Sequence, residues 1–232
     1  MENIKGSTMH VPLSQNKLLK APKAILFDWD GVIVDSEHMI FSALQRTFQH
    51  FNLEGPSVPD FYKFYGYSLE VAFKRDFKER WKEAREVYHQ IQMNTEKQKP
   101  EVFEGVQEFL ETLSLKKIYC AVVSNKKGDD LRKEAESLNL AHYFSKIVGA
   151  QDAGRSKPFP DPVEHALRDT GLNPHHHSVW FIGDRSVDME CAHTTKCIPI
   201  EAAFFVSKIE ENYRYPPTLT IRSYQELIKM LK

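Results

Sequence analysis

Short apolar runs bounded by polar residues recur along the chain, as the strands of a buried sheet would. The clearest run, 24–27, is followed at once by acidic residues and a glycine. A buried parallel strand leading into an active-site loop has this pattern. Similar runs predict strands over 118–124, 146–149, 178–183 and 197–200, and an edge strand over 218–221.

Between these runs, apolar residues recur every three or four positions, which is the helical period. This pattern predicts helices over 106–113, 129–138, 162–170 and 188–194. Gly171 stands where a helix-ending glycine belongs. Strands that alternate with helices indicate an α/β fold with a doubly wound, mainly parallel sheet. In such a sheet, ligands bind beyond the carboxyl ends of the strands.

The stretch from about 37 to 100 has no buried-strand pattern. Its aromatic and aliphatic residues recur at helical spacing, as Phe41, Leu44, Phe48 and Phe51 do, and such a stripe is typical of core packing. We therefore predict an all-helical domain inserted after the first strand. The expected division is a loosely ordered extension over 1–22, an α/β core over 23–36 plus 102–232, and a helical domain over 37–101.

Composition narrows the classes of partner. The 232 residues are 41% hydrophobic and 27% charged, with a formal net charge of -1. This balance argues against a nucleic-acid or anionic-membrane binder, and no segment approaches the ~20 apolar residues of a membrane span. The three cysteines lack metal-ligand spacing and the N-terminus lacks a signal-peptide pattern, which favours a cytoplasmic location. Oligomeric state stays open.

Two carboxylates, Asp28 and Asp30, follow the first strand directly, and Gly31 comes next. Neighbouring carboxylates repel each other, and a divalent cation such as Mg²⁺, which prefers oxygen ligands, removes that penalty. An ionised carboxylate can attack phosphorus, and a second one can protonate the leaving oxygen and then activate water. Gly31 keeps the loop backbone open, so that amide groups can face an anion. Alone, this acidic pair is equally typical of N-caps and turns.

Three more polar clusters follow later strands. Ser124 and Asn125 can donate to phosphoryl oxygens, although Ser-Asn is also ordinary turn chemistry. Lys157 precedes a proline-rich turn and can offset the charge of carboxylates and phosphate; alone, it is more simply an exposed loop lysine. Asp184 and Asp188 can ligate a metal and orient its waters or Lys157, although acidic pairs are also common at helix N-termini.

Together the four clusters supply a nucleophile, an acid/base, phosphate donors, a cation and metal ligands, which phosphoryl transfer requires. Their order and spacing resemble the haloacid-dehalogenase-like (HAD) superfamily, and the resemblance covers nearly the whole chain from Lys23 onward. The matching motifs are Asp28-Trp-Asp30-Gly31 with Asp35, then Ser124, then Lys157-Pro158, then Gly183-Asp184-x-x-x-Asp188.

The resemblance implies a role for each motif residue. Asp28 would be the nucleophile and Asp30 the general acid/base. Ser124 and Lys157 would bind the phosphoryl group, and the loop chemistry described above adds Gly31 and Asn125 as candidate phosphate-binding residues. The implied Mg²⁺ ligands are the Asp28 carboxylate, the Asp30 backbone carbonyl and Asp184, with Asp188 in support.

The helical insert resembles the cap domain of the phosphoglycolate-phosphatase and β-phosphoglucomutase branch, in which the cap closes over small phosphorylated substrates. The residues that resemble the substrate-specificity loop are Tyr65, Gly66, Tyr67 and Ser68. Sugar-phosphate mutases place a lysine and an arginine where this chain has Tyr65 and Leu69, and many relatives carry histidine at Ile40. These differences favour a phosphatase.

The leading hypothesis is a Mg²⁺-dependent phosphatase, phosphoglycolate-phosphatase-like, that hydrolyses a small phosphorylated metabolite through an aspartyl-phosphate. The alternatives are a sugar phosphomutase of the same branch and a catalytically silent binding module that kept the fold. Dehalogenase chemistry would need neither Mg²⁺ nor Asp30. Two departures from the family pattern are Trp29, where a smaller apolar residue is usual, and Thr195-Lys196, which replaces a common glycine.

Overall fold

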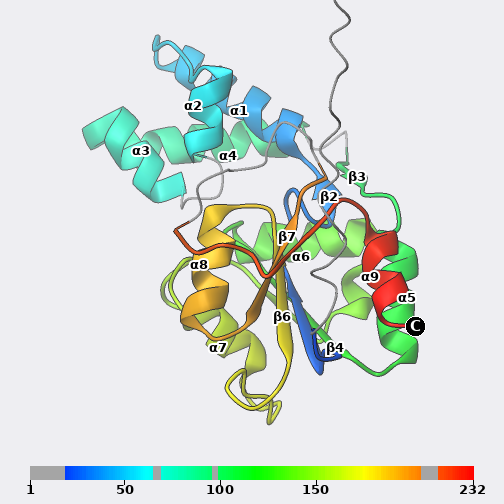
Figure 1. Cartoon of the computed structure of the whole chain (residues 1–232). Helices are drawn as coiled ribbons and strands as arrows, with labels where there is room; N and C mark the ends of the chain where they lie inside the picture. The colour runs from blue at the N-terminus through cyan, green and yellow to red at the C-terminus, as the bar shows by residue number, and fades with distance from the viewer. Residues whose placement is uncertain (1–18, 65–68, 96–98, 205–213) are drawn as a thin grey trace, which may run out of the picture.

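The computed structural model describes residues 19–64, 69–95, 99–204 and 214–232, and a six-stranded sheet forms its centre (Figure 1). The strands are β1 (Ala24–Phe27), β4 (Tyr119–Val123), β5 (Lys146–Val148), β6 (Val179–Gly183), β7 (Ile198–Ala202) and β8 (Leu219–Ile221). Their order is β5-β4-β1-β6-β7-β8, and all five pairings are parallel. The predicted α/β class is confirmed, with the last strand at an edge.

Helices cover both faces of this sheet because successive side chains of each buried strand point to opposite sides. In β1, Ile25 and Phe27 belong to one apolar cluster, whereas Ala24 and Leu26 belong to another. The first cluster includes residues of α5 (Val106–Leu115), α6 (Gly128–Ser137) and α9 (Tyr224–Met230). The second includes residues of α7 (Asp161–Leu167) and α8 (Ser186–Thr194). The predicted doubly wound architecture is confirmed.

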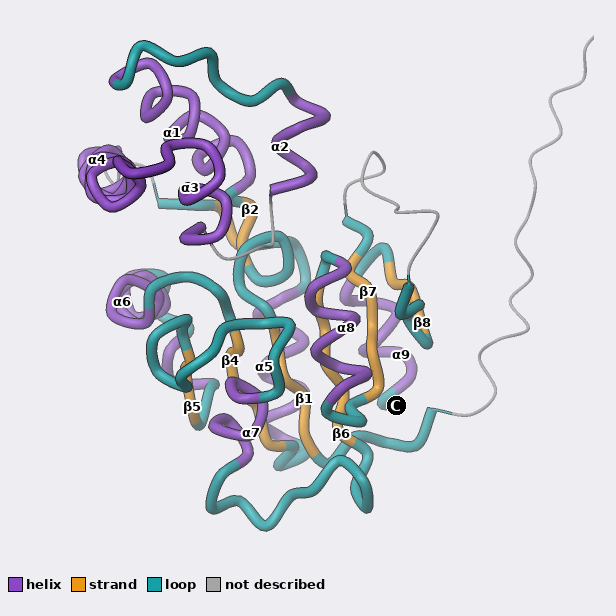
Figure 2. The backbone as a smooth tube through the Cα atoms, turned by 90° about the vertical axis from the view of Figure 1, so that its left-hand side faces the viewer, coloured by secondary structure: helices purple, strands orange, loops and turns teal. Residues whose placement is uncertain are grey.

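Four helices lie beyond the carboxyl ends of the strands and have an apolar cluster of their own (Figures 1 and 2). They are α1 (Glu37–His50), α2 (Val58–Phe64), α3 (Leu69–Phe77) and α4 (Trp81–Thr95), with a 3₁₀ turn over Lys78–Arg80. The chain enters and leaves this region through β2 (Val34–Asp35) and β3 (Glu101–Val102), which pair antiparallel. None of the described helices combines the length and apolarity that crossing a membrane requires.

The structure differs from the predicted elements in three places. The helix predicted over 162–170 ends at Leu167, and Asp169 (φ 67°) and Gly171 (φ 71°) both turn into the left-handed region. The helix α9 and the short β2–β3 pair were not predicted. Of the predicted extension over 1–22, only residues 19–22 are described, and they have no regular structure.

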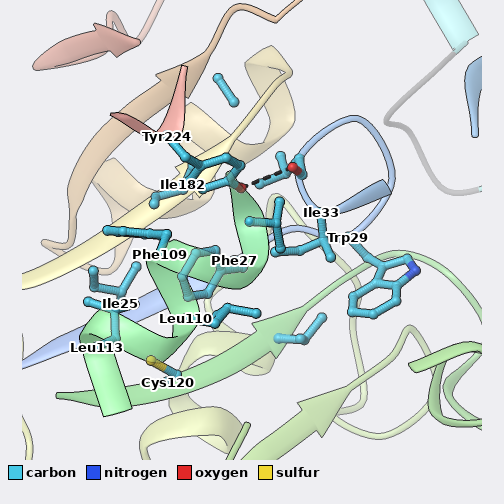
Figure 3. Close-up of a cluster of buried hydrophobic side chains, with 14 of the residues drawn as sticks. Ile25, Phe27, Trp29, Ile33, Phe109, Leu110, Leu113, Cys120, Ile182 and Tyr224 are labelled. Atoms are coloured by element: carbon cyan, nitrogen blue, oxygen red, sulfur yellow. Dashed lines mark hydrogen bonds between the residues drawn. The ribbon is translucent and has the colours of Figure 1, made fainter. Parts of the chain in front are cut away.

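Aromatic packing supports the loop that follows β1. Phe27 makes edge contacts with Phe109 and Phe144, with ring centroids 6.1 and 5.9 Å apart. The Tyr224 hydroxyl of α9 donates a hydrogen bond of 2.9 Å to the Val32 carbonyl (Figure 3). This bond ties the last helix of the chain to the loop that carries the first predicted motif.

Candidate active site

Three of the predicted site residues come from the ends of three adjacent central strands. Asp28 follows β1, Ser124 follows β4 and Asp184 follows β6. The register pairs Phe27 with both Val122 and Ile182, so the strands end almost level. All three side chains therefore meet at one edge of the sheet, and all three residues are buried.

Lys157 joins two of the predicted carboxylates. Its ammonium lies 2.8 Å from Asp28 Oδ1 and 2.7 Å from Asp188 Oδ1, and its side chain is 1% exposed. Although burial lowers it, the two neighbouring carboxylates raise the pKa of Lys157 above its ordinary value. The simple interpretation of Lys157 as an exposed loop lysine is therefore wrong, and the residue is a buried cation.

The buried carboxylates form a cluster suited to a divalent cation. Among the described residues, Asp28, Asp184 and Asp188 can each place one carboxylate oxygen within 4.8 Å of the others. Burial raises the pKa of Asp28 to about 7, against the opposing charge of Lys157. Burial likewise raises the pKa of Asp184 well above its ordinary value, although the nearby Arg185 opposes the shift. The folded protein thus disfavours the charged form of both carboxyl groups, which a bound cation would stabilise.

Asp184 gives the most direct indication of a cation. Both of its carboxylate oxygens are buried and accept no hydrogen bond from the described part of the chain, although Arg185 Nε forms an ion pair of 3.2 Å with Oδ2. Buried charges are normally paired or bound to a metal. A Cβ added at Gly31 would overlap this carboxylate, so only glycine at position 31 lets Asp184 occupy its place. The all-oxygen donor set fits a hard divalent ion.

Asn125, predicted to bind phosphate, lines the cavity between the strand ends and the helical insert and forms hydrogen bonds with the backbone of Lys157. Its Oδ1 accepts a hydrogen bond of 2.9 Å from Lys157 N, and its Nδ2 donates one of 3.1 Å to Lys157 O. These bonds fix the lysine relative to the end of β4. Ser124 Oγ accepts a bond of 3.2 Å from Lys126 N, which leaves its own proton to donate.

Asp30 lies apart from the buried carboxylates. Its Oδ1 accepts a hydrogen bond of 2.5 Å from Ser36 Oγ and lies 3.6 Å from Lys126 Nζ. Its predicted contribution to the metal is a backbone carbonyl, so this side-chain position fits the separate role of an acid/base. The amide of Gly31 donates a hydrogen bond of 2.9 Å to Val34 O, so within the turn this N–H already has an acceptor.

A cavity of about 790 Å³ opens between the strand ends and the helical insert. Its lining includes Asp28, Lys157 and Asp184 from the core and Ile40 from α1. Tyr88 of α4 also lines it; burial and then the charge of Asp30 raise the pKa of Tyr88, so this phenol remains protonated. Sequence analysis missed Tyr88 because it belongs to a helical stripe typical of core packing.

The remaining site predictions concern the helical insert and the family departures. The predicted specificity residues Tyr65 to Ser68 lie outside the described part of the chain. Thr195 is the C-cap residue that follows α8, and Lys196 comes next with φ 63°, the conformation that usually calls for glycine. The Thr195 hydroxyl donates 2.7 Å to the Cys191 carbonyl in this last turn.

Comparison with known proteins identifies the family. Residues 25–200 match the model of the haloacid dehalogenase-like hydrolases, which is well over half of the 232 residues. The chain belongs to this family. All four predicted motifs of this HAD-like hydrolase lie within the matched residues, so the resemblance seen in the sequence is confirmed.

Curated relatives agree with the predicted enzyme class, and a solved structure agrees with the fold. A phosphoglycolate phosphatase of Aquifex aeolicus is 28% identical over 210 residues, covering 90% of this chain and 96% of the relative. The pyrophosphatase PpaX of Halalkalibacterium halodurans is 24% identical, with 89% and 95% covered. Among solved structures, a HAD-like hydrolase of Streptococcus pneumoniae has a TM-score of 0.79 at 24% identity, covering 91% of this chain and 99% of that one.

Proposed function

We propose that this hydrolase is a Mg²⁺-dependent phosphatase that hydrolyses a small phosphorylated metabolite through an aspartyl-phosphate on Asp28. The observation that carries the proposal is the buried arrangement of Lys157 between Asp28 and Asp188, beside an Asp184 carboxylate that lacks hydrogen-bond donors among the described residues. In such a site the buried lysine can bind a phosphate, and the buried carboxylates can bind a divalent cation.

The first step transfers the phosphoryl group to Asp28. Asp28 Oδ1 accepts hydrogen bonds from Trp29 N (2.7 Å) and Lys157 (2.8 Å), so we assign the attack to Oδ2. The bond between phosphorus and the leaving oxygen breaks, and Asp30 gives its proton to that oxygen. Lys157 and the Ser124 hydroxyl hold the phosphoryl oxygens.

The second step hydrolyses the aspartyl-phosphate. Asp30, now a carboxylate, accepts a proton from a water molecule that attacks phosphorus, and the bond to Asp28 breaks. Inorganic phosphate leaves, and both carboxylates return to their starting state. Asp28, Asp184 and Asp188 would hold Mg²⁺, with the Asp30 carbonyl as a further ligand; bound there, the ion would neutralise charge that develops on the phosphoryl oxygens.

The helical region over 37–101 is proposed to act as a cap that shields these steps from bulk water. It already contributes Ile40 and Tyr88 to the cavity wall. His89 Nδ1 of α4 also lies 3.5 Å from Asp130 Oδ2 of α6, so the insert and the core touch at the cavity rim. The relatives named for phosphoglycolate and pyrophosphate make these two compounds the first substrates to test.

The test is phosphate release by the purified protein. Turnover of p-nitrophenyl phosphate is expected with MgCl₂ and is expected to disappear with EDTA or in Asp28→Asn. Asp169→Asn, an exposed carboxylate outside the cavity lining, is the matched control and should retain activity. Undiminished turnover by Asp28→Asn would overturn the nucleophile, and undiminished turnover in EDTA would overturn the metal dependence.

A mutase is separated from a phosphatase by its product. With a sugar 1-phosphate as substrate, a phosphatase releases free phosphate and sugar, whereas a mutase yields the 6-phosphate. Nuclear magnetic resonance of phosphorus distinguishes these products in one sample. Accumulation of the 6-phosphate without free phosphate would replace the phosphatase proposal with the mutase alternative.

A further inference from the structure

A chain of polar contacts connects Trp29 to Asp30 through helix α6. The Trp29 indole Nε1 donates a hydrogen bond of 2.6 Å to Glu134 Oε1. The other oxygen of Glu134 lies 2.5 Å from Lys126 Nζ. Lys126 Nζ in turn lies 3.6 Å from Asp30 Oδ1. The two ends of this path, Trp29 and Asp30, are adjacent in sequence. The residues between them on the path, Glu134 and Lys126, lie about a hundred positions further along the chain.

The path begins at a rigid group. Trp29 is fully buried, and its ring packs edge-on against Phe144 with centroids 6.2 Å apart. Figure 3 shows the Trp29 ring at the border of the apolar cluster, with its nitrogen turned away from Phe27. A ring held by packing gives its N–H a fixed direction, so Glu134 receives its hydrogen bond from a fixed donor.

Lys126 needs such support to stay in one place. A lysine side chain is flexible along its four-carbon stem, and its ammonium has no preferred geometry of its own. Here the side chains of Lys126 and Glu134 are only 19% and 16% exposed, so their contact is shielded from water and salt. Glu134 therefore holds the ammonium beside Asp30.

Asp30 is held from two sides by this arrangement. Ser36 and Lys126 both approach its Oδ1, at 2.5 and 3.6 Å, and Asp30 lines the cavity. We propose that Glu134 is a positioning residue: with Trp29, it holds Lys126 against Asp30 Oδ1, so that Oδ2 faces the leaving oxygen of the substrate. This inference rests on the proposed function, in which Asp30 protonates that oxygen.

If Glu134 positions Asp30, the rate lost when Glu134 is replaced should depend on the leaving group of the substrate. An alkyl phosphate leaves as a strongly basic alkoxide unless it is protonated, whereas p-nitrophenolate leaves well without a proton. General acid catalysis contributes about 10²–10⁴-fold, and a misplacement of about 1 Å costs on the order of 10²-fold. Disturbing Glu134 should therefore slow an alkyl phosphate far more than p-nitrophenyl phosphate.

The experiment compares kcat/KM for glycerol phosphate and p-nitrophenyl phosphate, because kcat/KM reports the step in which the leaving group departs. In Glu134→Gln, the ratio of the two values is expected to fall about 10²-fold, since glutamine keeps the shape but loses the charge that holds Lys126. Lys126→Met should lower the ratio similarly, and Lys126→Arg should restore part of it. Glu136→Gln, on the exposed side of α6, should leave the ratio unchanged.

Tryptophan offers a second matched pair. Trp29→Phe removes the indole donor and should lower the ratio in the same direction. Trp180→Phe makes the same substitution at a residue that is 1% exposed and whose Nε1 has no hydrogen-bond partner among the described residues. It should leave the ratio unchanged, which controls for the loss of ring volume.

The outcomes separate the two proposals. Wild-type protein that turns over neither substrate would refute the proposed function. Active wild-type protein with equal losses on both substrates in Glu134→Gln would refute the positioning role, because a structural defect slows both alike. If Glu134→Gln does not fold, Lys126→Met decides by the same ratio.

Discussion

Replacing Asp184 by asparagine is expected to stabilise the metal-free protein and to abolish its stabilisation by Mg²⁺. The two side chains have nearly the same shape, but asparagine carries no charge. Both oxygens of Asp184 are buried without hydrogen-bond donors among the described residues, and burial raises its pKa well above the ordinary value, with Arg185 opposing. The folded state therefore disfavours the carboxylate, whereas the unfolded chain does not.

The magnitude follows from the cost of an unsatisfied buried group, which is about 1–3 kcal/mol. For a chain of this size, each kcal/mol shifts the thermal midpoint by about 2–4 °C, so the variant should melt about 2–12 °C higher in EDTA. Because the raised pKa means that Asp184 binds its proton more tightly in the folded protein, the contribution of Asp184 to wild-type stability falls as pH rises above about 4. The advantage of Asp184→Asn should therefore be larger at pH 8 than at pH 5.

Magnesium should reverse the order of the two thermal midpoints, so that the wild-type protein melts higher than Asp184→Asn. A ligand at about 100 times its dissociation constant adds about 2.7 kcal/mol to the stability of wild-type protein, and the variant lacks the charge needed to share that gain. Differential scanning fluorimetry with EDTA or MgCl₂, at both pH values, measures each effect, with Asp169→Asn as the control. A lower midpoint in EDTA, or a full Mg²⁺ shift in Asp184→Asn, would show that this carboxylate is not a ligand of the cation.

Two further substitutions test the supports of the site. In Gly183→Ala, the new Cβ would overlap Asp188 Cβ; overpacking costs about 1–3 kcal/mol, and both the melting midpoint and phosphatase activity should fall as Asp188 moves away from Lys157. Unchanged stability and activity would contradict this close packing. In Tyr224→Phe, the Val32 carbonyl loses its donor, which should lower the free energy of unfolding in urea by about 1–3 kcal/mol; an unchanged value would mean that water replaces the bond.

The sheet and the convergence of its strand ends were predictable because they depend on local patterns. An apolar run followed by a polar residue marks the end of a buried strand, and parallel strands carry their carboxyl ends to one edge. The placing of Asp28, Ser124 and Asp184 at one edge needed no more than this. The helix α9 has apolar residues at helical spacing in Tyr224, Leu227 and Ile228, but one short helix at the chain end is a weak periodic signal.

The partners of polar side chains were not predictable, since hydrogen bonds join residues far apart in sequence. Asn125 has the sequence signature of a turn. Only the structure shows that its side-chain amide forms hydrogen bonds with both the N–H and the carbonyl of Lys157, 32 positions away. Trp29 stood out only as an unusual residue between two aspartates. Its indole N–H meets Glu134 across 105 positions, and no local pattern singles out Glu134 from its helical neighbours.

Gly31 shows how the motifs depend on one another. Its φ of 81° already favours glycine, and that alone would explain the residue as part of a turn. However, a Cβ at this position would also overlap the Asp184 carboxylate, which arrives from a different strand. The glycine of the first motif is thus required by the aspartate of the fourth. Any larger residue at 31 must displace Asp184, so a change in the turn would remove a candidate metal ligand 153 positions away.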